Sequence, residues 1–175
     1  MQVLFDTSVY IGAFRGDREA GLIFERWRGK APLWVSAVVL EELYAGADAA
    51  GARLIEKLER DFERARRVLV PNLSDWTQTG RILAKVGAMY GFERIGQGRL
   101  TNDALIATSA ARCQASMKRW GLIPQTSRRR WVLCRSICPH MKLTLSHIQE
   151  STPMGIEIWG TRPRVHNSSA CTHRW

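Results

Sequence analysis

Residues 1–8 read MQVLFDTS, and this stretch decides the fold that we expect for the chain. Residues 3–5 form a short apolar segment with β propensity, and Asp6 follows it directly. A helical spacing of apolar residues begins immediately afterwards. In open α/β sheets, ligands bind at the edge formed by the carboxyl ends of the strands. The sequence therefore predicts that Asp6 lies at such an edge, as one of several carboxylates that gather a divalent metal ion.

The same polar residues also suit a purely structural role. Asp, Thr and Ser are favoured at the N-cap of a helix, because their side-chain oxygens accept hydrogen bonds from its first free N–H groups. Asp6, Thr7 or Ser8 would then cap the helix that follows. The tripeptide fits both roles, so the rest of the chain has to decide between them.

Strand and helix patterns alternate along the first two thirds of the chain. Residues 32–36 and 68–71 read as further short strands. This alternation is typical of an α/β fold, in which helices flank a parallel sheet. Right-handed connections bring the carboxyl ends of such strands to one edge. The expected helices cover residues 9–14, 19–27, 37–47 (capped by Ser36), 51–67, 75–86 (capped by Ser74) and 100–111, with a loop at 91–98.

Composition divides the chain near Arg112. The formal net charge of +10 favours a nucleic-acid partner. Residues 1–111 carry 15 Lys and Arg against 14 Asp and Glu, whereas residues 112–175 carry 11 against 2. The second part also holds all four Cys and all four His, and it contains no Asp. We therefore expect a folded domain over residues 1–112 and a basic, Cys- and Arg-rich tail over residues 113–175 that is irregular or disordered.

Length and hydropathy place further bounds on the protein. A chain of 175 residues is long enough to bury a substantial core. No apolar run is long enough to span a bilayer, and the N-terminus lacks the basic and apolar regions of a signal peptide. These features predict a cytoplasmic protein with reduced cysteines and no membrane partner.

The expected helix over residues 37–47 carries two adjacent glutamates. Neighbours on a helix lie about 100° apart, so the two side chains cannot share one face. Val38 and Leu43 mark the apolar arc of this helix. Glu42 falls within that arc and Glu41 outside it. An inward carboxylate is costly unless a cation meets it, so Glu42 is predicted to face a metal ion, with pairing to an Arg side chain as the alternative.

Asp103 repeats this logic on the expected helix over residues 100–111. Ala107 and Ala110 share its face at i+4 and i+7, and such small side chains leave space beside a carboxylate. Asp103 also lies in the first helical turn, where the helix dipole favours a negative charge. That dipole interaction is the alternative explanation for this residue.

Three segments together resemble the PIN-domain nucleases, and among them the VapC-type toxins of bacterial toxin–antitoxin pairs. They are LFDTS at residues 4–8, VSAVVLEELYAG at residues 35–46 and LTNDALIA at residues 100–107. The segments occur in the family's order and at its separations, and the resemblance covers about residues 1–112. Three ordered motifs are far more specific than any one of them.

The resemblance implies a Mg²⁺- or Mn²⁺-dependent endoribonuclease that is held inactive by an antitoxin. Asp6, Glu42 and Asp103 correspond to the metal-site acids of the family. Asp6 and Asp103 would ligate the metal, while Glu42 would complete the inner shell or orient the attacking water. Thr7 or Ser8 would hydrogen-bond the substrate phosphate or a metal-bound water. The implied partners are an RNA substrate, the cognate antitoxin and a second copy of the chain in a homodimer.

After Arg112 the sequence departs from the family pattern. The family continues into another strand and a Thr-x-Asn/Asp-x-x-Asp-Phe motif that supplies a fourth acid, and no Asp is available here. We therefore expect a sheet that is incomplete at its C-terminal end. The gain in charge, the clustered Cys, Trp and His and the lost periodicity are typical of out-of-frame translation. We interpret this change in composition as the result of a frameshift near residue 113. Within the tail, only residues 141–148 are expected to form a regular element.

Two other functions fit parts of the sequence. Without the fourth acid, the chain would be an inactive PIN remnant that only binds an antitoxin-like partner. Alternatively, the tail would form a basic nucleic-acid-binding module, in which the Arg-rich residues 128–130 and Trp131 contact nucleic acid. There, Cys134, Cys138 and His140 would ligate zinc. The fourth zinc ligand would be one of three residues, Cys113, His147 or Cys171.

Overall fold

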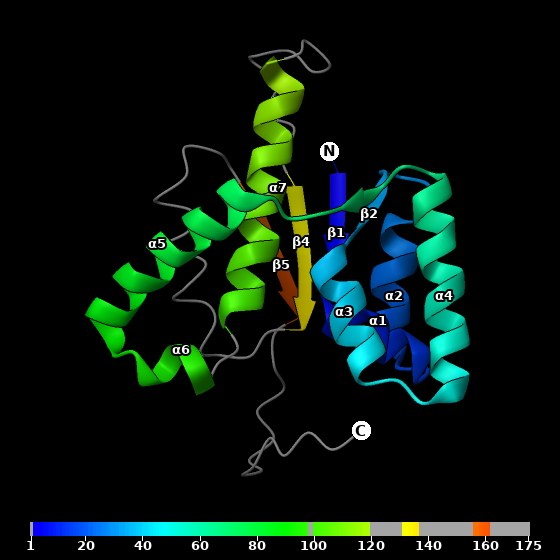
Figure 1. Ribbon diagram of the computed structural model, residues 1–175. Coiled ribbons are helices and arrows are strands. Elements are labelled where there is room, and N and C mark those ends of the chain that lie inside the picture. The colour runs from blue at the N-terminus through cyan, green and yellow to red at the C-terminus, as the bar shows by residue number, and fades with distance from the viewer. Residues whose placement is uncertain (1, 98–99, 120–130, 137–155, 162–175) are drawn as a thin grey trace.

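The computed structural model describes residues 2–97, 100–119, 131–136 and 156–161 (Figure 1). These residues form an α/β fold in which helices flank a parallel sheet. The elements in chain order are β1 (Gln2–Phe5), α1 (Thr7–Phe14), α2 (Arg18–Trp27), β2 (Leu33–Ser36), α3 (Ala37–Ala45), α4 (Ala49–Arg64), β3 (Val68–Leu69), α5 (Leu73–Tyr90), α6 (Glu93–Gln97), α7 (Leu100–Arg119), β4 (Trp131–Ser136) and β5 (Ile156–Thr161).

The strands of the sheet run parallel in the order β3-β2-β1-β4-β5, and the sheet is open. Val3 of β1 lies opposite Leu33 of β2 on one side and Val132 of β4 on the other. The strand order therefore reverses at β1. Ligand sites of open α/β sheets lie at such a reversal, at the carboxyl ends of the strands. The fold thus favours the end of β1, which Asp6 follows.

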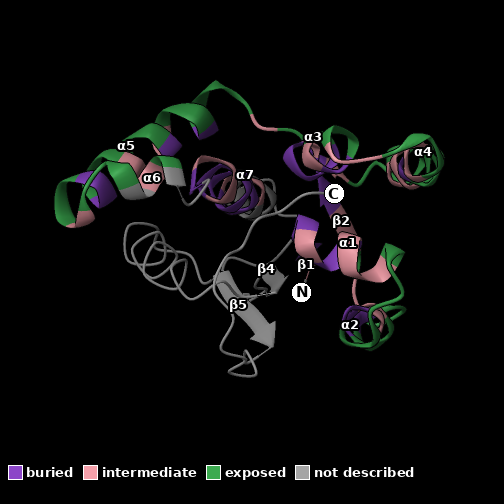
Figure 2. Ribbon diagram, turned by 90° about the horizontal axis from the view of Figure 1, so that it is seen from below, coloured by how far each residue is buried: buried purple, intermediate pink, exposed green. Residues whose placement is uncertain are grey.

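Helices cover both faces of this sheet (Figure 2). Seen from below, α1 and α2 lie on one side of β1, whereas α3, α5 and α7 lie on the other. The helices α5 and α7 pack against each other, and α3 contacts both α1 and α7. The helices α1, α3 and α7 are therefore held in place by packing on both faces of the sheet.

β1 lies at the centre of the hydrophobic core. Val3, Leu4 and Phe5 are each at most 1% exposed, so the strand is apolar on both faces as expected for a covered parallel sheet. Val39 of α3 and Leu105 of α7 are equally buried and pack into the same cluster. Each fully buried side chain of this kind stabilises the fold by about 1.5–3 kcal/mol. This packing fixes the backbone from which Asp6 projects.

An aromatic cluster attaches α1 and α2 to β1. The ring of Phe24 lies 4.5 Å from that of Phe5 and 5.4 Å from that of Tyr10, measured between centroids. Tyr10 is fully buried, and its hydroxyl has no hydrogen-bond partner among the described residues. Burial raises the pKa of Tyr10, because the phenolate would be desolvated. Tyr10 is therefore a neutral packing residue with an unsatisfied polar group.

Side-chain caps define where α2, α3, α4 and α5 begin, and the sequence predicted one of these four caps. The side-chain oxygen of Ser36 accepts a hydrogen bond from the Val38 N–H at 3.2 Å, which confirms the predicted cap of α3. The predicted cap of α5 at Ser74 is wrong. Asn72 caps this helix in a capping box with Asp75, in which each side chain accepts from the other residue's N–H. An acid three residues after an Asn was the signal for this start.

The segment between α5 and α7 also differs from the prediction. A loop was expected over residues 91–98, but the short helix α6 occupies part of it. Gly91 has φ = +92°, a conformation that favours glycine, and it ends α5. The chain turns there and resumes helical structure at once. The glycines of this segment indicated the turn correctly, but they led to the prediction of a loop where the short helix α6 forms.

Part of the segment after residue 112 contradicts the expectation of an irregular tail. Residues 113–119 continue α7, and β4 and β5 add two parallel strands beyond β1. The sheet therefore extends past β1 by two strands, and it stays open. Residues 131–134 are β-favouring in composition, and pairing with β1 supplies the ladder hydrogen bonds. Such pairing between distant segments leaves no periodic pattern in the sequence.

Other expectations for the tail concern residues that the structure does not describe. The expected element at residues 141–148 lies outside the described ranges, as do Cys138 and His140 of the zinc alternative. Among the helices that the structure describes, none is long and apolar enough to cross a membrane. The zinc site and the domain boundary at residue 112 remain predictions.

Candidate functional site at the carboxyl edge of the sheet

A hydrogen-bonded cluster around Glu42 joins three helices at the carboxyl edge of the sheet. Thr7 at the start of α1 donates a hydrogen bond from Oγ1 to Glu42 Oε2. Asn102 in the first turn of α7 donates from Nδ2 to Glu42 Oε1 at 2.7 Å. Glu42 itself lies on α3 and is half-buried, whereas its neighbour Glu41 is exposed. The predicted inward orientation of Glu42 is confirmed.

The partners of Glu42 argue against the alternative in which its carboxylate pairs with an Arg side chain. Within the described residues, the ion pairs join Arg60 to Glu56 and Arg112 to Asp75, and Glu42 takes part in neither. Its two carboxylate oxygens accept from a neutral hydroxyl and a neutral amide instead. Glu42 therefore has no partner cation from the described part of the chain. A carboxylate in this state is suited to meet a cation supplied from outside.

Asp6 follows β1 directly and is 9% exposed. It occupies the N-cap position of α1, but its side chain accepts no capping hydrogen bond from the helix backbone. Its Oδ2 accepts a hydrogen bond from Ser8 Oγ at 2.9 Å instead. The alternative in which the Asp6 side chain serves as the cap is therefore wrong. A nearly buried carboxylate at the reversal of strand order is suited to bind a ligand.

Asp103 lies in the first turn of α7 and is half-buried. Ala107 and Ala110, which the sequence placed on its face, are 1% and 3% exposed. Asn102, which contacts Glu42, directly precedes Asp103 in the chain. Thr7, which follows Asp6, and Asn102, which precedes Asp103, therefore both contact the Glu42 carboxylate. The dipole interaction of Asp103 with α7 is compatible with this position.

The three acids do not form a ready-made metal cluster. Among the described residues, no group of three or more His, Cys, Asp or Glu side chains is arranged to hold a metal ion. Carboxylates repel one another at close range, and the Glu42 oxygens are turned to Thr7 and Asn102. The donor chemistry nevertheless fits a hard divalent cation, because carboxylate and hydroxyl oxygens are the ligands that Mg²⁺ and Mn²⁺ prefer.

Asn102 contacts Glu42 but was not predicted to do so, although it lies within the segment LTNDALIA. Thr7 or Ser8 was expected to hydrogen-bond the substrate phosphate or a metal-bound water, and in the structure their hydroxyls donate to Glu42 and Asp6. Each hydroxyl has further capacity, since its oxygen can also accept. The signal for Asn102 was its place beside Asp103 at the start of a helix. A role of Thr7 and Ser8 in substrate binding remains a prediction.

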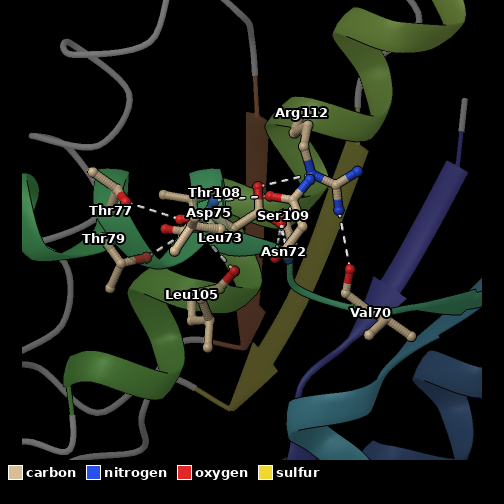
Figure 3. Close-up of polar contacts among 10 residues, drawn as sticks. All are labelled: Val70, Asn72, Leu73, Asp75, Thr77, Thr79, Leu105, Thr108, Ser109 and Arg112. Carbon is tan, nitrogen blue, oxygen red and sulfur yellow. Dashed lines mark hydrogen bonds and ion pairs between the residues drawn. The ribbon is translucent and has the colours of Figure 1, made fainter.

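A second polar cluster, which the sequence analysis also missed, fixes the packing of α5 against α7 (Figure 3). Asp75 is 1% exposed, and Arg112 Nε donates to its two oxygens at 2.8 and 2.9 Å. Ser109 Oγ donates to Oδ2 of Asp75 at 3.2 Å, and Arg112 Nη2 donates to the Val70 carbonyl at 3.0 Å. This cluster is fully paired within the protein, so its role is structural.

A cavity of about 480 Å³ lies at the opposite edge of the sheet, near the amino ends of β2 and β3. Its lining includes the cations Arg28, Lys30 and Arg67 together with Asp61 and Phe62. None of the three acids at the carboxyl edge contributes to it. The cavity is therefore separate from the Glu42 cluster.

Comparison with known protein families gives a match over most of the described part of the chain. The chain matches the PIN domain family over residues 3–116, a range that includes Asp6, Glu42 and Asp103. No curated protein matches the chain. PIN domains are generally nucleases that use divalent metals, and the match spans more than half of the chain. The chain therefore belongs to the PIN domain family.

Proposed function

We propose that this protein is a Mg²⁺- or Mn²⁺-dependent endoribonuclease that hydrolyses RNA phosphodiester bonds. The observation that carries the proposal is the bridging of Thr7, Glu42 and Asn102 at the carboxyl edge of the sheet. Through this bridge, the neighbours of Asp6 and Asp103 meet at one charged group. The chain neighbours of two of the proposed acids therefore contact the third acid, within a domain family of nucleases.

In this proposal Asp6 and Asp103 hold the metal ion. Mg²⁺ retains several waters and needs only one or two protein carboxylates, so two aspartates are sufficient as protein ligands. When bound, the ion polarises a phosphoryl oxygen, activates water and stabilises the charge that develops during in-line displacement. The hydroxyl of Ser8 keeps the Asp6 carboxylate oriented by its hydrogen bond to Oδ2.

Glu42 orients the attacking water in this mechanism. Its two oxygens are anchored by Thr7 and Asn102, which fixes the plane of the carboxylate. Each oxygen has a second lone-pair site that accepts a hydrogen bond from water. The contacts of Glu42 with Thr7 of α1 and Asn102 of α7 bring it to the chain neighbours of both proposed metal ligands.

The resemblance to VapC-type toxins extends this proposal to a biological role. The protein would be the toxin of a type II toxin–antitoxin pair, act in the cytoplasm as a homodimer, and be inhibited by a cognate antitoxin. Expression in a bacterium tests the role. We expect growth arrest that depends on Asp6 and is relieved by co-expression of the protein encoded next to this gene.

The enzymatic proposal is tested by incubating purified protein with labelled RNA and Mg²⁺ or Mn²⁺. We expect cleavage that chelation of the metal abolishes and that is lost in both Asp6→Asn and Asp103→Asn. Glu41→Gln is the control, because this residue is exposed and lies outside the cluster. Absence of cleavage with retained binding of an antitoxin-like partner would favour an inactive remnant. Metal-independent RNA binding lost on deletion of residues 113–175 would favour a basic binding module.

A further inference from the structure

Asn102 makes a contact that joins the two halves of the Glu42 cluster. Its Nδ2 lies 2.7 Å from Glu42 Oε1, although the two residues are 60 positions apart in the chain. Thr7 occupies the other carboxylate oxygen. A carboxylate accepts hydrogen bonds but donates none, so the amide and the hydroxyl are complementary partners for it. The two contacts leave the Glu42 carboxylate a single orientation.

We propose that Asn102 is a positioning residue that holds the Glu42 carboxylate in the orientation needed to direct water. The proposal rests on the nuclease function proposed above. Asn102 and Asp103 are adjacent, so their side chains project about 100° apart around α7. Asn102 therefore contacts α3, while Asp103, the proposed metal ligand, projects in another direction around α7. The hydrogen bond fixes the rotation of α7 relative to α3, and with it the position of the Asp103 backbone.

The neutrality of Asn102 is part of its role. An Arg or Lys at this position would pair with the charge of Glu42 and compete with a bound cation. An amide positions the carboxylate by a hydrogen bond while leaving its charge intact. Asn102→Asp keeps the shape of the side chain but places a second carboxylate within hydrogen-bond distance of Glu42. Asn102→Ala removes the contact without adding charge. The two variants therefore separate loss of positioning from added repulsion.

The test compares wild type, Asn102→Ala, Asn102→Asp and the control Thr101→Ala, which alters the preceding residue on the same helix turn. Steady-state RNA cleavage gives kcat and KM separately, and calorimetric titration with Mn²⁺ in the absence of RNA gives metal affinity. Second-sphere partners of metal sites typically contribute about 10–100-fold. We expect Asn102→Ala to lower kcat by about 10–100-fold with KM changed less than about 2-fold, and to weaken Mn²⁺ binding.

The remaining outcomes discriminate between the two proposals. Asn102→Asp should lose more activity than Asn102→Ala, and Thr101→Ala should match wild type in kcat and Mn²⁺ affinity. Thermal unfolding of each variant shows whether it is folded. Wild-type cleavage accompanied by unchanged kcat and Mn²⁺ affinity in folded Asn102→Ala would overturn the positioning role alone. A wild-type protein that neither binds Mn²⁺ nor cleaves RNA would overturn both proposals.

Discussion

Two carboxylates of this protein are held in opposite ways. Asp75 on α5 is 1% exposed and lies 2.8 Å from the guanidinium of Arg112, with Ser109 as a further donor. Glu42 on α3 is half-buried and accepts only from the neutral side chains of Thr7 and Asn102 in the described part of the chain. The charge of Asp75 is compensated by Arg112 inside the fold. The Glu42 carboxylate is oriented by its two partners but has no cation beside it among the described residues.

Under the proposed function, the difference separates a structural acid, Asp75, from a functional acid, Glu42. Removing either partner of a buried ion pair destabilises the fold, because the remaining charge is left uncompensated. A carboxylate held by neutral donors keeps its charge for a ligand, at some cost in stability. The Asp75 cluster should therefore determine how strongly the fold resists unfolding. The Glu42 cluster should determine what the folded protein does.

Arg112→Ala is expected to give the largest change in the free energy of unfolding. It leaves the Asp75 carboxylate without its cation and the Val70 carbonyl without its donor. Because the Arg112 side chain is 33% exposed, we expect a loss of about 3 kcal/mol, at the lower end for buried pairs. Urea unfolding followed by circular dichroism measures this loss.

The matched control for that variant is Arg60→Ala. Arg60 pairs with Glu56 at 3.9 Å on the surface of α4, and both side chains are more than half exposed. Exposed pairs of this kind contribute about 0.3–0.5 kcal/mol. Equal losses in Arg112→Ala and Arg60→Ala would contradict the structural role of the Asp75 cluster.

Tyr10→Phe is expected to stabilise the protein. The buried Tyr10 hydroxyl has no partner among the described residues, and an unsatisfied buried polar group costs about 1–3 kcal/mol. Removing it should raise the free energy of unfolding by about 1 kcal/mol and Tm by about 2–4 °C in a chain of this size. Tyr44→Phe is the control, because the exposed Tyr44 hydroxyl donates to Glu59 at 2.6 Å. A Tm that falls in Tyr10→Phe would show that the hydroxyl is satisfied.

Glu42→Gln is expected to give the smallest change in stability. The substitution removes a charge that has no partner cation in the described residues while retaining the size of the side chain. The change in unfolding free energy should stay below about 1 kcal/mol, whereas RNA cleavage should be lost. Glu41→Gln should leave both unchanged. A large loss of stability in Glu42→Gln would place Glu42 in the same structural class as Asp75.

Local sequence patterns predicted the parts of this fold that depend on local physics. The apolar run before Asp6, the Ser36 cap and the inward face of Glu42 follow from strand propensity, side-chain capping and helical periodicity. Each requires only a few neighbouring residues. The parallel sheet followed from the alternation of such elements. The assignment of Asp6, Glu42 and Asp103 to a metal site stays a prediction.

The missed features depend on residues that are distant in sequence. Asp75 and Arg112 are 37 positions apart, and Asn102 lies 60 positions from Glu42. β4 forms because β1 offers an unpaired edge, which no pattern within residues 131–136 reveals. The absence of a three-carboxylate cluster among the described residues was equally hidden, because it depends on how side chains rotate to neutral donors.

The frameshift that we infer for the segment after Arg112 remains a prediction. The family match ends at residue 116, close to the change in composition near residue 112. The nucleotide sequence around the Arg112 codon tests the frameshift directly. We expect a shifted frame to encode a Thr-x-Asn/Asp-x-x-Asp-Phe motif after α7. An uninterrupted frame with no such motif in either alternative would exclude a frameshift.

The most direct test of the central claim is to locate Mn²⁺ by anomalous diffraction in crystals of the protein soaked with the ion. The central claim is that Asp6 and Asp103 meet beside Glu42 to bind a hard cation. We predict one anomalous peak at about 2.0–2.2 Å from carboxylate oxygens of both aspartates, within reach of Glu42 through one water. A peak bound elsewhere, or none at this edge under saturating Mn²⁺, would contradict the account.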